Sequence, residues 1–314
     1  MCIGLLMDCD TGLDIVTGAT GYTGKYITRR LLGLGRCVRS LTGHLNRANP
    51  FDGQVALVPY NFDDPIALAA NLEGATTLYN TYWVRFSHGR ATFDVAVQNT
   101  KILLEAAKLA GVRRVIHVSI ANPDERSPLP YYKGKALLER AVMDSGLEYA
   151  ILRPTVIFGR EDILINNIAW LLRTFPVFAI AGSGQYRIQP VFVEDLAELA
   201  VQAAQSKESV VLDAVGPQVF TFNELVRLIA RAIQSKAAII HTNPTLLLLM
   251  SKAVGSLVKD VLLTREEIDG LMADLLVSSG VPTAQTRFSE WLGHNAGNLG
   301  RQYASELKRH YSPH

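Results

Sequence analysis

The sequence predicts an α/β fold, a doubly wound parallel sheet with helices on both faces. Short apolar runs alternate with helical patterns about five times over residues 13–150, at the spacing of β–α–β units. A glycine-rich segment lies between the first apolar run and the first helical pattern. Beyond Gly159 the alternation loosens, so a smaller and mainly helical region is expected after the sheet.

The first turn of this fold carries the segment Thr17-Gly18-Ala19-Thr20-Gly21-Tyr22-Thr23-Gly24. An apolar run precedes it at residues 13–16, and a helical pattern begins at about Lys25. Glycine has no Cβ, so the backbone of such a turn can lie against a pyrophosphate, and the helix start offers unpaired N–H groups to the anion. The segment predicts a dinucleotide site, with a plain glycine turn as the alternative. The contacts are expected from Gly18, Thr20, Gly21, Tyr22, Thr23 and Gly24.

The end of the second predicted strand, residues 37–41, is where the adenosine ribose of the cofactor is expected. A cofactor without a 2′-phosphate usually meets an Asp or Glu there, and residues 38–43 contain neither. Arg39 can pair with a 2′-phosphate through its planar guanidinium, with help from His44 and Arg47. The sequence therefore favours NADP(H) over NAD(H), and a solvent-facing Arg39 is the alternative.

Four positions after the third and fourth strands are expected beside the cofactor. Asn61 and Phe62 follow the strand predicted at residues 55–59, and they are placed to touch the adenine by polar contact and by packing. Asn80 and Thr81 end the fourth strand, and this end faces the middle of the cofactor.

Two segments are expected at the reacting end of the cofactor. Trp83 and Phe86 belong to an aromatic loop after the fourth strand, and such loops often line a substrate pocket. Packing against a neighbouring helix is the alternative for this loop. Pro154 closes the sixth strand, and the backbone after it, Val156 included, is predicted to hydrogen-bond the nicotinamide carboxamide.

Tyr131 and Lys135 are the residues best suited to acid–base chemistry. They lie four positions apart on a predicted helix, so both side chains share one face. A nearby ammonium favours phenolate and lowers the pKa of tyrosine, and the same lysine can hydrogen-bond a ribose hydroxyl. Of the eleven tyrosines, Tyr131 alone has a lysine four residues later. We predict an acid–base pair, with a solvated surface pair as the alternative. His117, inside the apolar fifth strand, is predicted to be a hydrogen-bonded core residue.

The composition indicates a globular protein that acts on a small molecule. Hydrophobic residues make up 48% and charged residues 19% of the 314 positions, and the net charge of +2 gives no case for nucleic acid. The seven histidines show no metal-ligand spacing, so no metal is expected. The three cysteines form no C-x-x-C pair, which is typical of a reducing, cytoplasmic setting. No feature of the sequence assigns an oligomeric state.

The apolar segment at residues 245–263 raises the question of membrane contact. Lys252, Lys259 and Asp260 interrupt it, whereas a spanning helix needs about 20 nearly uncharged residues. An ordinary helix is predicted there, and a helix on a membrane surface is the alternative.

Three regions follow from these patterns. Residues 1–12 are an extension, and residues 13–165 are the dinucleotide-binding core. Residues 166–314 are a mixed region, whose strands near 189–193 and 210–213 rejoin the core. Within it, residues 236–314 are expected to be mainly helical and to form the substrate side.

These motifs together resemble the short-chain dehydrogenase/reductase superfamily, in an atypical branch close to the extended epimerase/dehydratase type. The resemblance covers roughly residues 13–235 and rests on Thr17 to Gly24, Asn61-Phe62-Asp63, Val118-Ser119, Tyr131 with Lys135, and Arg153-Pro154 with Gly159. Within that branch the chain is similar to proteins related to the nucleotide-binding accessory subunit of respiratory complex I and to nitrogen-regulator-like (NmrA-type) sensors. The resemblance implies a Rossmann fold and bound NAD(P)(H). In active members it also implies Tyr131 as acid or base with Lys135 as its helper.

Two positions depart from the family pattern. Active members carry a Ser or Thr just past the fifth strand that hydrogen-bonds the substrate carbonyl, and this chain has Ala121 there. Losing such a donor weakens transition-state stabilisation. Either Ser119 or Asn122 replaces it, or the enzyme works differently, or it does not turn over. Gly43 stands where NADP-preferring relatives often place an arginine.

Three functions therefore compete. The first is an NADP(H)-dependent oxidoreductase that acts on a carbonyl or enone of a small apolar substrate. The second is a non-catalytic NADP(H)-binding sensor or scaffold, which Ala121 favours and the Tyr131/Lys135 pair disfavours. The third is a nucleotide-sugar epimerase or dehydratase, which the apolar segment near residue 250 and the lack of a clear diphosphate clamp disfavour.

Overall fold

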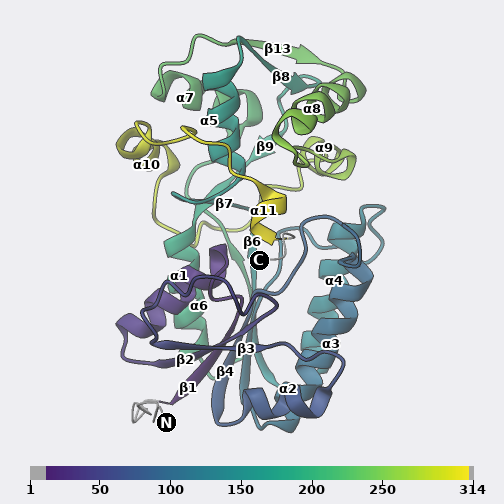
Figure 1. Ribbon diagram of the computed structural model, residues 1–314. Coiled ribbons are helices and arrows are strands. Elements are labelled where there is room, and N and C mark those ends of the chain that lie inside the picture. The colour runs from purple at the N-terminus through teal and green to yellow at the C-terminus, as the bar shows by residue number, and fades with distance from the viewer. Residues whose placement is uncertain (1–11, 311–314) are drawn as a thin grey trace.

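A parallel sheet of seven strands forms the centre of the computed structural model, which describes residues 12–310 (Figure 1). The strand order is β11-β6-β5-β4-β1-β2-β3, and every neighbouring pair is parallel. All carboxyl ends therefore meet at one edge, which we call the carboxyl edge. The strands are β1 (Leu13–Thr17), β2 (Cys37–Thr42), β3 (Val55–Pro59), β4 (Ala75–Asn80), β5 (Arg114–Val118), β6 (Glu148–Pro154) and β11 (Val210–Ala214).

Helices cover both faces of this sheet, so the predicted doubly wound fold is confirmed (Figure 1). One face carries α1 (Tyr22–Gly33) and α6 (Val193–Gln205), and the other carries α2 (Pro65–Leu72), α3 (Phe93–Leu109) and α4 (Pro130–Asp144). Each interface has its own apolar core. Val16 and Ile116 belong to the first core, and Ile15 and Val115 to the second, because side chains alternate along each strand.

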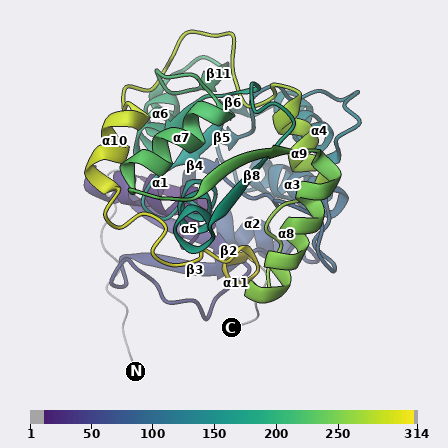
Figure 2. The same ribbon diagram turned by 90° about the horizontal axis from the view of Figure 1, so that it is seen from above.

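The remaining elements lie beyond the carboxyl edge and share a third apolar core that includes Phe158, Leu225 and Phe288 (Figures 1 and 2). Two-stranded sheets join β10 to β7, β12 to β9 and β13 to β8. The elements are β7 (Val156–Phe158), α5 (Leu164–Thr174), β8 (Val177–Ala181), β9 (Arg187–Ile188), β10 (Pro190–Phe192), β12 (Phe220–Thr221), α7 (Phe222–Ala232), β13 (Ala238–Thr242), α8 (Pro244–Val258), α9 (Arg265–Met272), α10 (Phe288–Asn295) and α11 (Glu306–His310).

Two elements differ from the sequence-based expectation. The first helix begins at Tyr22 rather than near Lys25, because Gly21 is its N-cap and the polar first turn hides the start. The strand β13 lies in the region expected to be mainly helical, and no residue of it is fully buried, so its apolar pattern is weak. The strand β11 joins the sheet beside β6, whereas β10 pairs only with β7. The domain boundaries themselves stay a prediction, and the extension at residues 1–11 lies outside the described residues.

One further observation concerns the apolar segments of the chain. Among residues 12–310, no helix has the length and apolar character needed to cross a membrane. The cytoplasmic location stays a prediction.

We expect the substitution Gly24→Ala to destabilise the fold. A Cβ on Gly24 would lie 2.3 Å from the Gly18 carbonyl oxygen, so α1 would have to move away from β1. Overpacking of this kind typically costs about 1–3 kcal/mol in the free energy of unfolding. The matched control is Gly33→Ala in the same helix, where a Cβ would meet nothing within 4 Å. Urea unfolding measures both variants, and equal midpoints for Gly24→Ala and the wild type would contradict the expectation.

Candidate nucleotide cleft and adjoining cavity

The glycine segment forms a turn whose backbone is open to an anion. Gly18 has a φ of +65°, in the left-handed region that favours glycine. Its N–H donates to the Leu41 carbonyl at 2.8 Å, and its own carbonyl accepts from the Gly21 N–H at 2.8 Å. The helix α1 starts directly after Gly21 with no side-chain cap. The first N–H groups of α1 are therefore left to a ligand or to water.

The close approach of α1 to this turn shows whether the residues present leave room for a dinucleotide. A Cβ on Gly24 would lie 2.3 Å from the Gly18 carbonyl oxygen, and one on Gly21 would lie 3.0 Å from the same atom. On the opposite wall, a Cβ on Gly159 would lie 2.6 Å from the Tyr22 hydroxyl. We call the turn at residues 18–24, together with the start of α1, the cradle. Only glycine at these positions leaves the cradle wide enough for a ligand. The residues present therefore fit a bound pyrophosphate.

A hydrogen-bonded network forms the floor between β1, β4 and β5. The Thr81 N–H donates to the Thr17 hydroxyl at 2.7 Å, and the Thr81 hydroxyl donates to the Thr17 carbonyl at 2.6 Å. The Asn80 amide lies 3.1 Å from Nδ1 of His117, and both side chains are fully buried. His117 is the hydrogen-bonded core residue that the sequence predicts, and burial followed by the Lys135 charge lowers its pKa. Asn80 thus supports the floor, while Thr81 lies against Gly18.

Aromatic rings gather at the carboxyl ends of β3 and β4, where the adenine is expected. Phe62 stacks on Tyr60 with ring centroids 4.8 Å apart, and Tyr82 lies 5.2 Å from Phe62. Asn61 between them has a positive φ of 47°, a conformation that asparagine tolerates better than most residues. Sequence reasoning missed Tyr60 and Tyr82, although both flank predicted site residues. Contact of Asn61 and Phe62 with adenine stays a prediction.

Arg39 does not reach the predicted 2′-phosphate position. Its guanidinium donates to the carbonyls of Asn71 and Glu73, at 2.8 and 3.4 Å. Those carbonyls lie at the end of α2, just before β4 begins at Ala75, and so near the amino ends of the strands. The prediction for Arg39 is therefore wrong. Arg39 is in the middle of β2, and its long side chain extends toward the amino ends of the strands. The nucleotide is expected at the opposite, carboxyl edge.

Lys135 is buried, and its amine contacts the end of β5 and the Trp83 ring. Its Nζ donates to the Val118 carbonyl at 2.9 Å and lies 4.8 Å from the centre of the Trp83 ring. Burial lowers the pKa of Lys135 to about 7. The pKa of Tyr131 is raised by burial first and then by the Glu267 charge. Burial is the largest cause at both groups and favours their neutral forms, and the roles of Tyr131 and Lys135 as an acid–base pair stay a prediction.

Ser119 and Asn122 are the two candidate replacements for the hydroxyl that Ala121 lacks. Both side chains already hydrogen-bond within the protein. The Ser119 hydroxyl is buried and donates to Oε1 of Glu139 at 2.5 Å, and Arg153 pairs with the same carboxylate. The side-chain amide of Asn122 donates to the carbonyls of Leu275 and Val277, at 3.0 and 2.8 Å. Ser119 therefore lies between β5 and α4, and this bonded position does not support the catalytic role, which stays a prediction.

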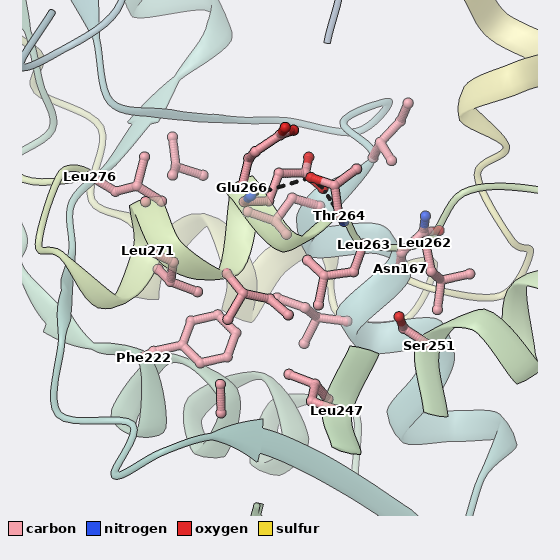
Figure 3. Close-up of a pocket in the computed structure, with 18 of the residues that line it drawn as sticks. Asn167, Phe222, Leu247, Ser251, Leu262, Leu263, Thr264, Glu266, Leu271 and Leu276 are labelled. Carbon is pink, nitrogen blue, oxygen red and sulfur yellow. Dashed lines mark hydrogen bonds between the residues drawn. The ribbon is translucent and has the colours of Figure 1, made fainter. Parts of the chain in front are cut away.

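A cavity of about 640 Å³ begins at the carboxyl edge and extends into the C-terminal part. Near the edge it is lined by Ile120, Tyr131 and Val156. Farther away its walls are apolar side chains of α5, β8, α8 and α9, and Figure 3 shows Phe222, Leu247 and Leu271 facing one another across it. The charged residues that line it are Arg85, Glu266, Glu267 and Glu306.

Trp83 and Phe86 do not line this cavity, so the prediction for them is wrong. The Trp83 ring stacks on Phe93 at 5.7 Å and meets Tyr131 edge-on at 5.8 Å, and these two rings form the wall in front of it. A Cβ on Gly134 would lie 2.7 Å from the indole, which explains the glycine. Phe86 is buried elsewhere. Pro154 is buried and its carbonyl accepts from the Ala121 N–H at 2.9 Å, whereas the neighbouring Val156 reaches the cavity.

Comparison with known proteins agrees with this geometry. Residues 18–163 match the family model described as NAD(P)H-binding. The chain is 29% identical over 227 residues to "NADH dehydrogenase [ubiquinone] 1 alpha subcomplex subunit 9, mitochondrial" of Arabidopsis thaliana, over 68% of this chain and 56% of that protein. It is 32% identical over 171 residues to "Sterol demethylase protein B" of Methylococcus capsulatus, over 47% of this chain and 52% of that protein. The chain thus spans little more than half the length of these relatives.

Solved structures show the same fold. Triphenylmethane reductase of Citrobacter sp., solved in complex with NADP(H), superposes with a TM-score of 0.73 at 17% identity, over 90% of this chain and 99% of that one. A nucleoside-diphosphate-sugar epimerase of Staphylococcus aureus superposes with a TM-score of 0.68 at 15% identity, over 94% and 98% of the two chains. Such low identities show the fold alone. Residues 18–163 thus match the NAD(P)H-binding family model, and the whole chain has a Rossmann-like α/β fold.

Proposed function

We propose that the protein is an NADP(H)-dependent oxidoreductase that acts on the carbonyl or enone of a small apolar compound. One observation carries this proposal: the apolar cavity begins beside Ile120, Tyr131 and Val156. Ile120 and Val156 lie just past the ends of β5 and β6, where the nicotinamide of a dinucleotide on the glycine segment is expected. A substrate in the cavity would thus meet the reacting end of the cofactor at the Tyr131 side chain.

Tyr131 suits the reduction of a carbonyl. Burial raises the pKa of its phenol, so the hydroxyl keeps its proton at neutral pH and can donate it to a developing alkoxide. When bound, the cofactor supplies the hydride. Lys135 is a positioning residue in this proposal, because it binds the Val118 carbonyl and supports the Trp83 ring behind Tyr131.

The lining of the cavity supports an apolar substrate. Apolar side chains form most of its wall, with leucine and isoleucine the commonest, and such a surface favours a ligand with little polar area. Arg85 is the cation in the lining, and it is already paired with Glu267 and Glu306. A nucleotide sugar would leave its diphosphate without a free cation among these lining residues. The apolar wall therefore disfavours the epimerase or dehydratase alternative.

The preference for NADP(H) no longer rests on Arg39. It rests on the absence of an acid in residues 38–43 and on Arg47, which follows β2. A structure with the same fold was solved with NADP(H), which supports the preference without deciding it.

A non-catalytic nucleotide-binding role is the second candidate. The observation in its favour is that Ala121 has no hydroxyl and that Ser119 and Asn122 are bonded elsewhere. The name of a relative as a subunit of NADH dehydrogenase also agrees with a role inside an assembly. Both candidates require the nucleotide cleft, and turnover separates them. A cytoplasmic location and contact of residues 245–263 with a membrane surface stay untested in either case.

We expect Tyr131→Phe to abolish turnover and keep cofactor binding. The variant keeps the ring that packs on Trp83 and Phe93 and removes only the hydroxyl. Loss of a general acid lowers kcat by about 10²–10⁴-fold. Oxidation of NADPH with a panel of apolar ketones and enones gives the rate, and fluorescence titration gives the Kd for NADPH. Tyr149→Phe, on β6, is the control. Equal rates for Tyr131→Phe and the wild type would contradict the role, and NADPH binding without any turnover would favour the sensor.

We expect the buried amine of Lys135 to make the free energy of unfolding rise with pH. Its pKa is about 7 in the folded protein and about 10.4 in an unfolded chain. Between these values the unfolded state binds more protons, so stability increases with pH across this window. Lys135→Met should lack that increase. Urea unfolding of both proteins between about pH 7 and pH 10 measures the difference, and parallel profiles would contradict a buried, largely neutral amine.

A further inference from the structure

We propose that the C-terminal helix α11 is part of the nucleotide site, where Arg309 and Arg47 bind the phosphate groups of the cofactor. The proposal rests on the proposed NADP(H) binding and adds a segment that the glycine motif does not contain. Figure 1 shows α11 between the sheet and the C-terminal elements, and Figure 2 shows it toward the β2 and β3 side.

Contacts place both arginines at the rim of the cradle. The Arg309 guanidinium lies 5.9 Å from the centre of the Tyr22 ring, and Tyr22 is the first residue of α1. The Arg47 guanidinium donates to the main-chain carbonyl of Arg309. Arg47 is five residues past the end of β2, on the side where the adenosine ribose is expected. The two cations thus lie beside the pyrophosphate position and beside the 2′-phosphate position.

The charged groups around Arg47 and Arg309 leave a net positive charge that an anion could neutralise. Arg47 is half-buried, and its pKa is lowered by burial and by the charge of Arg309, a second cation. Arg309 is faced by the carboxyls of Asp162 and Glu306. Burial raises the pKa of Asp162 to about 7, so its negative charge is weak at neutral pH, and Glu306 pairs with Arg85. Among the described residues, no ion pair neutralises Arg47 or Arg309. A phosphate would satisfy both guanidinium groups.

The helix is anchored independently of the arginines. The carboxylate of Asp260 accepts from the N–H groups of Glu306 and Leu307, at 2.6 and 3.1 Å, and from the Tyr303 hydroxyl at 2.8 Å. Glu306 at the start of the helix reaches the cavity and pairs with Arg85. One helical turn therefore carries Glu306 to the substrate side and Arg309 to the nucleotide side. Removing the Arg309 side chain should leave this anchor in place.

Titration of NADPH and NADH into the purified variants tests the proposal. Arg309→Ala should weaken both cofactors by about tenfold or more, because each carries the pyrophosphate. Arg47→Ala should weaken NADPH more than NADH, because only NADPH carries the 2′-phosphate. Arg309→Lys, which keeps the charge, should recover part of the affinity. The control is Arg301→Ala, since Arg301 is exposed and donates to the Gly297 carbonyl at 2.6 Å.

Two results would overturn the proposal. One is an Arg309→Ala variant that melts at the temperature of the wild type and binds both cofactors with unchanged Kd. The other is an equal loss of affinity in Arg309→Ala and the Arg301→Ala control. Failure of the wild type itself to bind either cofactor is distinguishable, because it would contradict the nucleotide cleft as a whole. Slower hydrogen exchange of the α11 amides with NADPH than without it is the supporting readout, and it does not depend on turnover.

Discussion

The structure depends on one close approach, that of the helix α1 to the turn after β1. The Gly18 carbonyl occupies the space that a Cβ on residue 24 would need. This contact sets the start of α1 against the carboxyl edge, and among residues 12–310 no side chain caps its first N–H groups. A site for an anion thus follows from packing, before any charged side chain is considered. In the sheet, β1 lies between β2 and β4, so this turn lies at the middle of the carboxyl edge.

The second constraint is burial at the reacting end. Tyr131 and Lys135 share a helix, and the Lys135 amine donates to the Val118 carbonyl and lies over the Trp83 ring. Desolvation raises the pKa of the phenol and lowers that of the amine, so both groups favour their neutral forms. A protonated phenol beside an apolar cavity is consistent with proton donation, which makes carbonyl reduction the better supported direction. The side chains of Ser119 and Asn122, the two candidate replacements for the hydroxyl missing at Ala121, are both hydrogen-bonded within the chain.

Most of the sheet could be predicted from the sequence, because periodicity and glycine spacing are local signals. The parallel sheet with helices on both faces, the glycine turn and the buried His117 all follow from them. The directions of individual side chains could not be predicted from these signals. Arg39 is in the expected strand, yet its guanidinium reaches the opposite edge of the sheet. Trp83 is in the expected loop, yet Phe93 from α3 lies in front of it.

The missed parts of the site come from segments distant in sequence. Arg309 reaches Tyr22 across nearly the whole chain, and the cavity wall comes from α5, α8 and α9. No local pattern marks a residue that becomes functional only through such tertiary contacts. The pyrophosphate site could be predicted because one short segment forms it. The wall of the cavity could not, because it is assembled from several elements of the C-terminal part.

A crystal structure of the protein grown with NADP⁺ tests the central claim most directly. The account predicts density for the pyrophosphate on the N–H groups between Gly18 and Gly24, with the nicotinamide ring between Val156 and the Tyr131 hydroxyl. A saturated crystal with an empty cradle, or a nicotinamide turned away from Tyr131 and the cavity, would contradict it.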